Sequence, residues 1–392
     1  MEGSTTAAWK ITFEINMMWS KKLPKKVDRI LVHVAHPAHV HFLKNTIINL
    51  INKDIEVQIA ATEKELVLYL LDSLGLKYEV VGKNLKGMHN KFRNFIRTVL
   101  NISKLAIKEK VDLLVGVGSI YAAQSGLILK KPYINFGDTE MSRFDNLLLP
   151  FSDVIIRPVC YMDNIRYPNE IRYNGFKELA YLHPNYFKPS KEVLRELNIS
   201  KKEKIIVMRL ISWSASHDVG LRGIRRGTEI KFIKSLENYG KVFITSETKI
   251  KHLKNYELKL PPEKIHSLLY YADLYIGEGG TMATEAAVLG TPAIHIESWN
   301  GVATGEFSGN FRELRDKYGM LYFYPDQTQA LEKAVEILDN DRSKLEWRRK
   351  RKKLLKDKID VTAWMTDFIE RYPESFYEYM REGKKVVSKT LK

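Results

Sequence analysis

Short apolar runs alternate with amphipathic segments along the first half of the chain. The apolar runs predict buried strands, whereas the segments between them carry apolar residues at helical spacing and predict helices. The expected strands of this half are 29–35, 55–62, 78–82, 111–119 and 131–140. Strands that alternate with helices at this spacing indicate right-handed crossover connections within a parallel sheet.

The alternation breaks at residues 172–190, where Tyr, Pro and Asn are frequent, and then begins again. We interpret this stretch as the linker between two domains. The expected strands of the second half are 204–210, 241–247, 273–280 and 292–296. The predicted fold is therefore α/β, with two Rossmann-like domains in series, each built on an open parallel sheet.

The length of 392 residues agrees with two domains, since one domain commonly holds roughly 150–200 residues. The expected segments are an N-terminal extension at 1–26, a first domain at 27–185, a second at 186–345, and C-terminal helices at 346–392 that pack back on the first. Open sheets bind ligands beyond the carboxyl ends of their strands, so we expect a site in the cleft between the two domains.

The single cysteine, Cys160, excludes an intrachain disulfide and indicates a reducing compartment. No window approaches the ~18–20 uninterrupted apolar residues of a membrane span. The first 26 residues lack a long apolar core, and their lysines follow the apolar part, so we expect no signal peptide there. These features predict a cytoplasmic protein.

The formal net charge of +16 favours an anionic partner, which could be nucleic acid, an anionic membrane or a phosphorylated substrate. The basic residues concentrate in KKLPKK, KFRNFIRTVLNISKLAIKEK and KLEWRRKRKKLLKDK. No RNA-binding signature, zinc finger or helix-turn-helix pattern accompanies them, so specific nucleic-acid binding is not expected. A solvated lysine-rich surface explains the charge as well.

An apolar strand runs directly into a glycine turn and a helix in YIGEGGTMATEAAVLGTPAIHI, residues 275–296. Gly279 and Gly280 let the backbone approach a ligand closely, and the helix from Thr281 offers unpaired N–H groups at the positive end of its dipole. This combination suits a diphosphate, and Glu285 could accept hydrogen bonds from both ribose hydroxyls. A purely structural turn, with Glu285 favoured by the dipole, explains the pattern equally well.

The run GGTMATEAAVLGTP closely resembles the nucleotide-sugar signature of GT-B enzymes. Those enzymes include the lipid-linked N-acetylglucosaminyltransferase of peptidoglycan synthesis and UDP-N-acetylglucosamine 2-epimerase. The resemblance implies that Glu285 binds the ribose, and it assigns the diphosphate to Gly279, Gly280 and Thr281. The upstream segment LPPEKIHSLLYYADLYIGEGG resembles the stretch that holds the base, which makes Ile265 and His266 candidates there.

The chain from about residue 27 to 340 is similar to an uncharacterised, largely archaeal family of predicted glycosyltransferases related to that epimerase. The motifs that carry this similarity, in order, are HPAHVHF, GDTE, RYNGFKELAYL, SWSASHDVG and GEGGTMATEA. The resemblance implies a GT-B-like fold, with two Rossmann-like domains whose parallel sheets face each other across a cleft. It also implies a UDP-sugar donor and no cofactor.

Four histidines lie within residues 33–41, in and after the first expected strand. His39 or His41 could act as general base on an acceptor hydroxyl or donate to a phosphate. A zinc site is compatible with the spacing, but no cysteine or carboxylate is nearby, so we expect no metal. Capping of the next helix and packing are the alternative roles for these histidines, His36 included.

The segment RLISWSASHDVG follows the first strand of the second series and therefore faces the same expected site. Arg209 can neutralise a phosphate, and His217 with Asp218 is a candidate oriented pair. Three serines supply small hydrogen-bond donors: Ser212, Ser214 and Ser216. A polar loop whose serines only satisfy its own backbone is the alternative.

Acidic residues end several expected strands. Asp138 or Glu140 could be the catalytic base of an inverting transfer, although either could instead cap the next helix or bind water. Ser246 and Glu247 close another strand on the nucleotide side and could contact sugar or phosphate. Glu278 is anomalous, because an acid beside a diphosphate repels it unless the side chain points away or holds a metal.

The function that these features predict is inverting transfer of a sugar from a UDP-sugar donor to an unknown acceptor. A 2-epimerase is the first alternative, weakened because the epimerase motif HRxEN is absent and Ala283 and Thr284 replace a glutamine and a glutamate of its signature. A non-catalytic nucleotide-sugar or nucleic-acid binding protein is the second alternative.

A lipid-linked acceptor would require contact with an anionic membrane, and one predicted helix of the first domain has a suitable pattern. Its basic residues are Lys91, Arg93, Arg97, Lys104 and Lys108. The apolar residues between them are Phe92, Phe95, Ile96, Leu100 and Leu105. An ordinary crossover helix with its apolar side on the sheet is the alternative, in which case the protein is simply cytoplasmic.

Overall fold

The computed structural model describes residues 23–64, 66–83, 87–137, 140, 151–162, 167–200, 202–211, 220–246, 248 and 250–381, and only the backbone of Met88, His89 and Lys91. The chain forms two compact units. The first contains residues 1–159, 163–181 and 359–392, and the second contains 160–162 and 182–358. The expected boundary at 345 differs from this division, because the second unit continues through Lys358 before the chain returns to the first.

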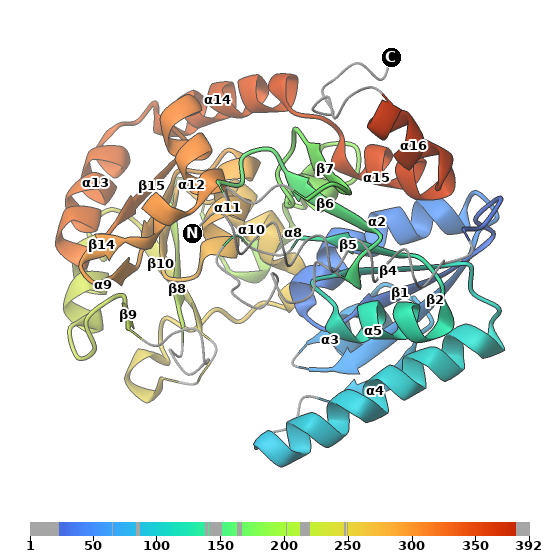
Figure 1. The fold of residues 1–392 in the computed structure, drawn as a ribbon. Coiled ribbons are helices and arrows are strands. Elements are labelled where there is room, and N and C mark those ends of the chain that lie inside the picture. Colours follow the sequence, from blue (N-terminus) through green and yellow to red (C-terminus); the bar gives the residue numbers. More distant parts are fainter. Residues whose placement is uncertain are drawn as a thin grey trace. The chain divides into compact units, whose positions relative to one another are not determined.

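The first unit is built on a seven-stranded parallel sheet with the order β3-β2-β1-β4-β5-β6-β7 (Figure 1). Its strands are β1 (Arg29–Val34), β2 (Glu56–Glu63), β3 (Glu79–Lys83), β4 (Leu113–Val117), β5 (Tyr133–Phe136), β6 (Val154–Pro158) and β7 (Glu170–Tyr173). The central strands are buried along almost their whole length, as expected for a parallel sheet covered on both faces.

Helices connect these strands and cover the sheet. They are α2 (Pro37–Ile51), α3 (Val67–Ser73), α4 (Met88–Lys108), α5 (Ile120–Leu129), α7 (Leu179–Leu182), α15 (Val361–Glu370) and α16 (Glu374–Arg381). The C-terminal α15 packs on α2, where Asn49 Nδ2 donates to Thr366 Oγ1 at 3.3 Å and Lys53 pairs with Glu370 at 2.6 Å. The end of the chain therefore completes the first unit.

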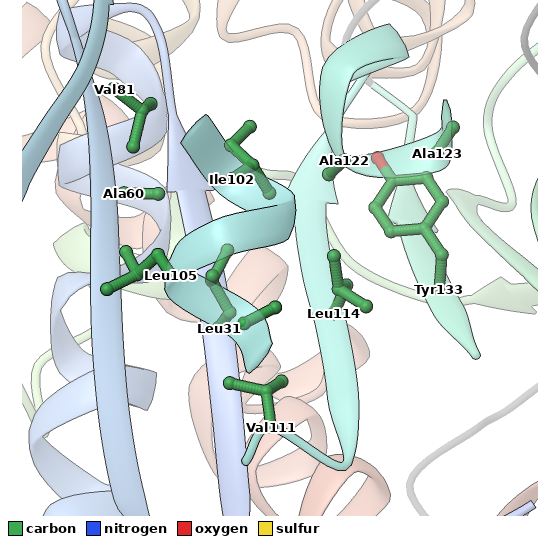
Figure 2. Packing of buried hydrophobic residues seen from close by; sticks show 11 residues of the cluster. Leu31, Ala60, Val81, Ile102, Leu105, Val111, Leu114, Ala122, Ala123 and Tyr133 are labelled. Carbon is green, nitrogen blue, oxygen red and sulfur yellow. The ribbon is translucent and has the colours of Figure 1, made fainter. Parts of the chain in front are cut away.

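A hydrophobic core lies between the sheet of the first unit and the helices α4 and α5 (Figure 2). Ile102 and Leu105 of α4 lie in one cluster with Leu31 and Leu114 of the central strands, and all four side chains are buried. Tyr133 of β5 fills the end of the same cluster beside α5. Burial of large aliphatic side chains at about 25 cal/mol per Å² is the main stabilising contribution in such a core.

The second unit has a five-stranded parallel sheet with the order β10-β8-β11-β12-β15. Its strands are β8 (Ile205–Leu210), β10 (Lys241–Ser246), β11 (Leu274–Gly277), β12 (Ala293–Ile296) and β15 (Leu321–Tyr324). A small antiparallel sheet joins β9 (Leu221–Arg222), β13 (Ser298–Trp299) and β14 (Val302–Ala303).

The helices of this unit connect and flank the sheet. They are α8 (Glu192–Glu196), α9 (Glu229–Glu237), α10 (Ile265–Tyr271), α11 (Gly280–Leu289), α12 (Gly309–Arg312), α13 (Gln327–Asp339) and α14 (Ser343–Asp357). Short 3₁₀ turns lie at Lys251–Leu253, Pro262–Lys264 and Thr304–Phe307, and a π-helical turn lies at Glu313–Lys317. The prediction of two α/β units with parallel sheets is confirmed.

The interpretation of residues 172–190 as a linker is wrong for its first half. Tyr173 ends β7 inside the sheet, and Phe176, Leu179 and Tyr181 are buried in the first unit. Strands β6 and β7 were not predicted, because the apolar run of β6 spans only Val154–Ile156 and β7 alternates charged and apolar residues.

Candidate functional site

Each parallel sheet has a topological switch point, where consecutive strands of the chain lie on opposite sides of one central strand. In the second unit β8 lies between β10 and β11, and in the first unit β1 lies between β2 and β4. Open parallel sheets hold ligands beyond the carboxyl ends of the strands at such a switch point. The glycine turn follows β11, and Arg209 lies near the carboxyl end of β8, so both lie at the switch point of the second unit.

The glycine turn is shaped by close contact with β8. Gly277 has φ +150°, and a Cβ at this residue would lie 2.3 Å from the carbonyl oxygen of Arg209, so no larger residue fits. Gly279 has φ +86°, which L side chains rarely adopt. The two glycines therefore allow the chain to turn sharply against β8 and enter α11.

The first turn of α11 is left open to a ligand. Gly279 is its N-cap, and no side chain among the described residues caps it. The equivalent turn of the first unit is closed, because Ser119 caps α5 and its hydroxyl accepts the N–H of Ala122 at 3.1 Å. Since the first N–H groups of a helix have no intrahelical partner, α11 can offer them to an anion, whereas α5 uses its own serine.

Arg209 lies beside this turn. It is in register with Gly277 of β11 and Thr245 of β10, one residue before the end of β8. Its side-chain Cγ lies 3.7 Å from the position that a Cβ of Gly279 would occupy. The aliphatic stem of Arg209 therefore borders the glycine turn.

Glu278, which the sequence left unexplained beside a presumed diphosphate, is fully buried. Its two carboxylate oxygens accept the backbone N–H groups of Ile211 and Ile224, each at 2.8 Å. The hydroxyl of Tyr275 donates to its carbonyl oxygen at 3.0 Å. Glu278 thus joins the glycine turn to Ile211, just after β8, and to Ile224, just after β9.

Two residues of the candidate nucleotide set contact each other. His266 of α10 and Glu285 of α11 are both buried, and His266 Nε2 lies 3.0 Å from Glu285 Oε1. The ring of Phe187 meets His266 edge-on, with centroids 6.3 Å apart. Ile265, the first residue of α10, is half-buried. The carboxylate of Glu285 therefore has an imidazole partner that orients it.

Two further residues of the nucleotide set, Thr281 and Ser246, lie at the same edge of the sheet. Thr281 is exposed in the first turn of α11. Ser246 ends β10, and its hydroxyl accepts the N–H of Thr248 at 3.4 Å. Glu247 lies outside the described residues, as do the loop candidates Ser212, Ser214, Ser216, His217 and Asp218.

A buried histidine near the carboxyl end of β12, the strand beside β11, was not among the predicted site residues. His295 is buried, with its Nε2 3.4 Å from the Thr304 hydroxyl, and its ring meets Phe311 edge-on at 5.0 Å. Phe311 also lies 3.3 Å from the position of a Cβ on Gly280. Thr304 and Phe311 fall in ESWNGVATGEFSGNF, and His295 lies two residues before it. The Gly and Ser content of this stretch was the only feature of the sequence that indicated a loop near a site.

The histidines of the first unit have distinct surroundings. His36 caps α2 by accepting the N–H of Ala38 at 3.2 Å. His39 is buried, and its ring lies 5.8 Å from that of His36. His41 stacks on Tyr181 at 5.4 Å, so part of its surface is used in packing. His39 and His41 are both on the first turns of α2, at the switch point of their own sheet.

His33 is a structural group at that same point. Its Nδ1 lies 2.7 Å from the Ser119 hydroxyl and its Nε2 lies 3.1 Å from the Thr62 hydroxyl, so it joins the carboxyl ends of three neighbouring strands. Burial, and secondarily the neighbouring His39, lower the pKa of His33 to about 3 from its ordinary value of 6.5. His33 is therefore neutral in the folded protein.

This shift makes stability depend on pH. Between pH 6.5 and 3 the unfolded chain binds a proton at residue 33 that the folded chain does not, so stability falls as pH falls through that window. On moving from pH 7 to pH 5, wild type should lose about 2 kcal/mol more unfolding free energy than His33→Gln. Urea titrations at both pH values measure the difference, and equal pH dependence in the two proteins would contradict the assignment.

The candidate acids of the first unit are only partly described. Glu140 is half-buried in a turn after β5, and Asp138 lies outside the described residues. Within the described ranges, no group of three or more His, Cys, Asp or Glu side chains is arranged to hold a metal ion.

The fold of the two units is that of GT-B glycosyltransferases and related epimerases. The structure of UDP-GlcNAc 2-epimerase from Methanocaldococcus jannaschii matches with a TM-score of 0.56 at 15% identity, covering 82% of this chain and 98% of that one. The crystal structure of Streptomyces sp. SF2575 glycosyltransferase SsfS6, complexed with thymidine diphosphate, matches with a TM-score of 0.52 at 14% identity, covering 86% and 99%. At these identities the likeness concerns the fold alone.

Within this class the chain belongs to the family described as protein of unknown function (DUF354), which matches residues 28–368. Uncharacterized protein MJ0665 from M. jannaschii is similar at 25% identity over 275 residues, which are 68% of this chain and 80% of that protein. The family and fold expected from the ordered motifs are confirmed.

Proposed function

We propose that the second unit binds a UDP-sugar at its switch point and that the protein transfers the sugar, with inversion, to an acceptor. The observation that carries this proposal is the uncapped first turn of α11 beside the stem of Arg209. The N–H groups of this turn and the guanidinium bind the diphosphate, and they stabilise the charge that develops on it as the glycosidic bond breaks. Glu285 binds the ribose, and His266 orients it.

The acceptor hydroxyl loses its proton to a base of the first unit as it attacks the anomeric carbon. His39, His41, Asp138 and Glu140 are the candidates, and the UDP-sugar is the only small molecule required besides the acceptor. A histidine is suited to this role because its ordinary pKa lies near neutral pH. UDP leaves with the electron pair of the broken bond, on the opposite face of the sugar from the attacking oxygen.

An epimerase reaction is the second candidate, because the fold is shared with UDP-GlcNAc 2-epimerase. The surroundings of Thr284 disfavour it. This threonine replaces an acid of the epimerase signature, and its hydroxyl donates to the carbonyl of Gly280 at 3.0 Å, within its own helix. Asn310 Nδ2 lies 3.4 Å from the same hydroxyl. A threonine held in this way offers no acid or base for proton transfer at a sugar carbon.

Incubation with UDP-N-acetylglucosamine in deuterium oxide separates the two reactions. A 2-epimerase exchanges deuterium into C2 of the sugar, whereas a transferase leaves that carbon unchanged, so we expect no C2 exchange by NMR. A panel of UDP-sugars is assayed in parallel for free UDP.

The matched variants in that panel are Arg209→Ala and Arg222→Ala. The first should lower UDP release and UDP affinity by about tenfold or more, the expected cost of one charge-assisted contact. The second removes an exposed arginine of the same unit and should behave as wild type. Deuterium at C2 would replace the transferase proposal by the epimerase, and equal UDP affinity of both variants would remove Arg209 from the site.

A further inference from the structure

Only part of the apolar surface of helix α4 packs in the core. Val99, Ile102 and Leu105 are buried beneath it. Other apolar side chains of the helix remain accessible: Phe92 and Ile107 are each 65% exposed, and Ile96 and Leu100 are 45% and 49% exposed. One of the two alternatives for this helix was an ordinary crossover helix with its apolar side on the sheet. The structure shows that packing on the sheet accounts for only part of the apolar residues of α4.

The exposed residues form two adjacent stripes. Phe92, Ile96 and Leu100 are four residues apart, so they lie on one side of the helix, and Ile107 continues that side two turns later. The basic residues beside this stripe are Arg93, Arg97, Lys104 and Lys108, of which Arg93, Arg97 and Lys108 each directly follow an exposed apolar residue. We call these eight residues the α4 surface. Figure 1 shows α4 as the long helix at one border of its unit, beside α5.

The charge of the α4 surface is of one sign. Residues 88–108 include no Asp or Glu. Lys108 pairs with the neighbouring Glu109 at 3.0 Å, whereas Arg93, Arg97 and Lys104 form no ion pair within the part of the chain that the structure describes. The side chain of Lys91, which belongs to the predicted basic pattern, lies outside the described residues.

We propose that the α4 surface docks on an anionic membrane, with α4 lying in the plane of the lipid headgroups. Apolar side chains beside basic ones fit this interface, because the apolar stripe enters the acyl boundary while Arg and Lys reach the headgroups. In the described residues no helix is long and apolar enough to cross a bilayer, so the contact is peripheral. This inference stands on α4 alone and is independent of the proposed donor site.

Two other occupants fit less well. A second copy docked on the same surface would bring like-charged stripes together, because a two-fold interface uses the same patch on both subunits. Nucleic acid would match the charge, but aliphatic Ile96, Leu100 and Ile107 offer its bases no stacking surface. Helix α14 is an internal comparison, since it exposes Arg349, Lys352 and Lys353 but, of large apolar residues, only Leu345.

Co-sedimentation of the full chain with vesicles tests this proposal. One set of vesicles is neutral phosphatidylcholine, and the other also contains about 30% phosphatidylglycerol, an anionic fraction chosen to give a strongly negative surface. At about 0.1 M salt we expect binding to the anionic vesicles only, and substantial loss at about 1 M, where screening acts within roughly 3 Å.

Three double variants locate the contact. Arg93→Glu with Arg97→Glu should weaken binding by more than about tenfold. Ile96→Ser with Leu100→Ser keeps the charge and should weaken it by about tenfold, because two inserted side chains are lost. Lys352→Glu with Lys353→Glu makes the same charge change on α14 and should bind nearly as wild type. Circular dichroism and melting curves confirm that each variant folds, which is expected because the altered residues are exposed.

Several results would overturn the proposal. These are no binding of wild type to anionic vesicles, equal loss in the α4 and α14 charge variants, or full binding by the Ile96→Ser, Leu100→Ser protein. A dimer in solution that this last variant converts to monomers would assign the surface to a second copy. Tighter binding of the wild type to single-stranded RNA than to anionic vesicles, abolished by the Arg93 and Arg97 changes, would assign it to nucleic acid.

Discussion

Glu278→Ala is expected to lower the free energy of unfolding of the second unit by about 2–5 kcal/mol, because it leaves two buried backbone N–H groups without their acceptor. Those groups belong to Ile211 and Ile224, which flank segment 212–219. Since Glu278 is part of the glycine turn that is proposed to bind the diphosphate, loss of UDP affinity should accompany the loss of stability. Urea unfolding and calorimetry with UDP measure the two effects.

Two matched variants separate the causes. Glu278→Gln keeps the shape of the side chain but replaces one acceptor oxygen by an NH₂ group, which then faces a backbone N–H. This variant should therefore retain part of the wild-type stability and a smaller part of the wild-type UDP affinity. Glu263→Ala removes an exposed glutamate from the same unit and should change stability by less than about 0.5 kcal/mol. Wild-type stability of Glu278→Ala would mean that the two hydrogen bonds contribute nothing measurable.

The environment of Glu278 shows where prediction from sequence stops. The glycine turn could be predicted because strand, turn and helix are consecutive in the chain, so local spacing suffices. The partners of its carboxylate are 67 and 54 residues earlier. Their proximity depends on β8 being the neighbour of β11, which no local pattern encodes. The sequence therefore raised the question of an acid beside a presumed anion, and the strand order answers it.

The segment RYNGFKELAYL fails as a linker for a related reason. Its Tyr and Asn content is typical of exposed connections, but burial is decided by what packs against it. Tyr173 stacks on Trp364 of α15 with ring centroids 5.4 Å apart, and the Ile359 N–H donates to the carbonyl of Asn174 at 3.1 Å. Both partners come from the far end of the chain. Composition alone cannot anticipate that the C-terminus returns to cover this segment.

The histidines in and after β1 show another limit, because their clustering does not indicate what each of them does. Clustering predicted a functional edge, and β1 does end at the switch point of its sheet. The individual roles differ because each imidazole meets other neighbours: a capped N–H for His36, hydroxyls for His33 and the ring of Tyr181 for His41. These neighbours come from four different elements, so spacing within one loop could not distinguish them.

Glu285→Ala is expected to weaken UDP binding by about 1–3 kcal/mol, or ~5- to 150-fold in Kd, the cost of losing charge-assisted hydrogen bonds to the ribose. Because Glu285 is buried against His266, the variant also leaves that imidazole without its carboxylate. A loss of affinity could therefore come from the missing ribose contact or from a shift of α10. Calorimetry with UDP alone does not distinguish these causes.

Comparison of UDP with its 2′,3′-dideoxy analogue does distinguish them. Wild type should bind the analogue less tightly than UDP by the same ~5- to 150-fold, since the analogue lacks both hydroxyls that Glu285 is proposed to bind. Glu285→Ala should bind the two ligands equally, whereas His266→Asn should keep most of the preference for UDP, because the carboxylate remains. If Glu285→Ala still prefers UDP as strongly as wild type does, the ribose is held by another residue and Glu285 serves only to pair with His266.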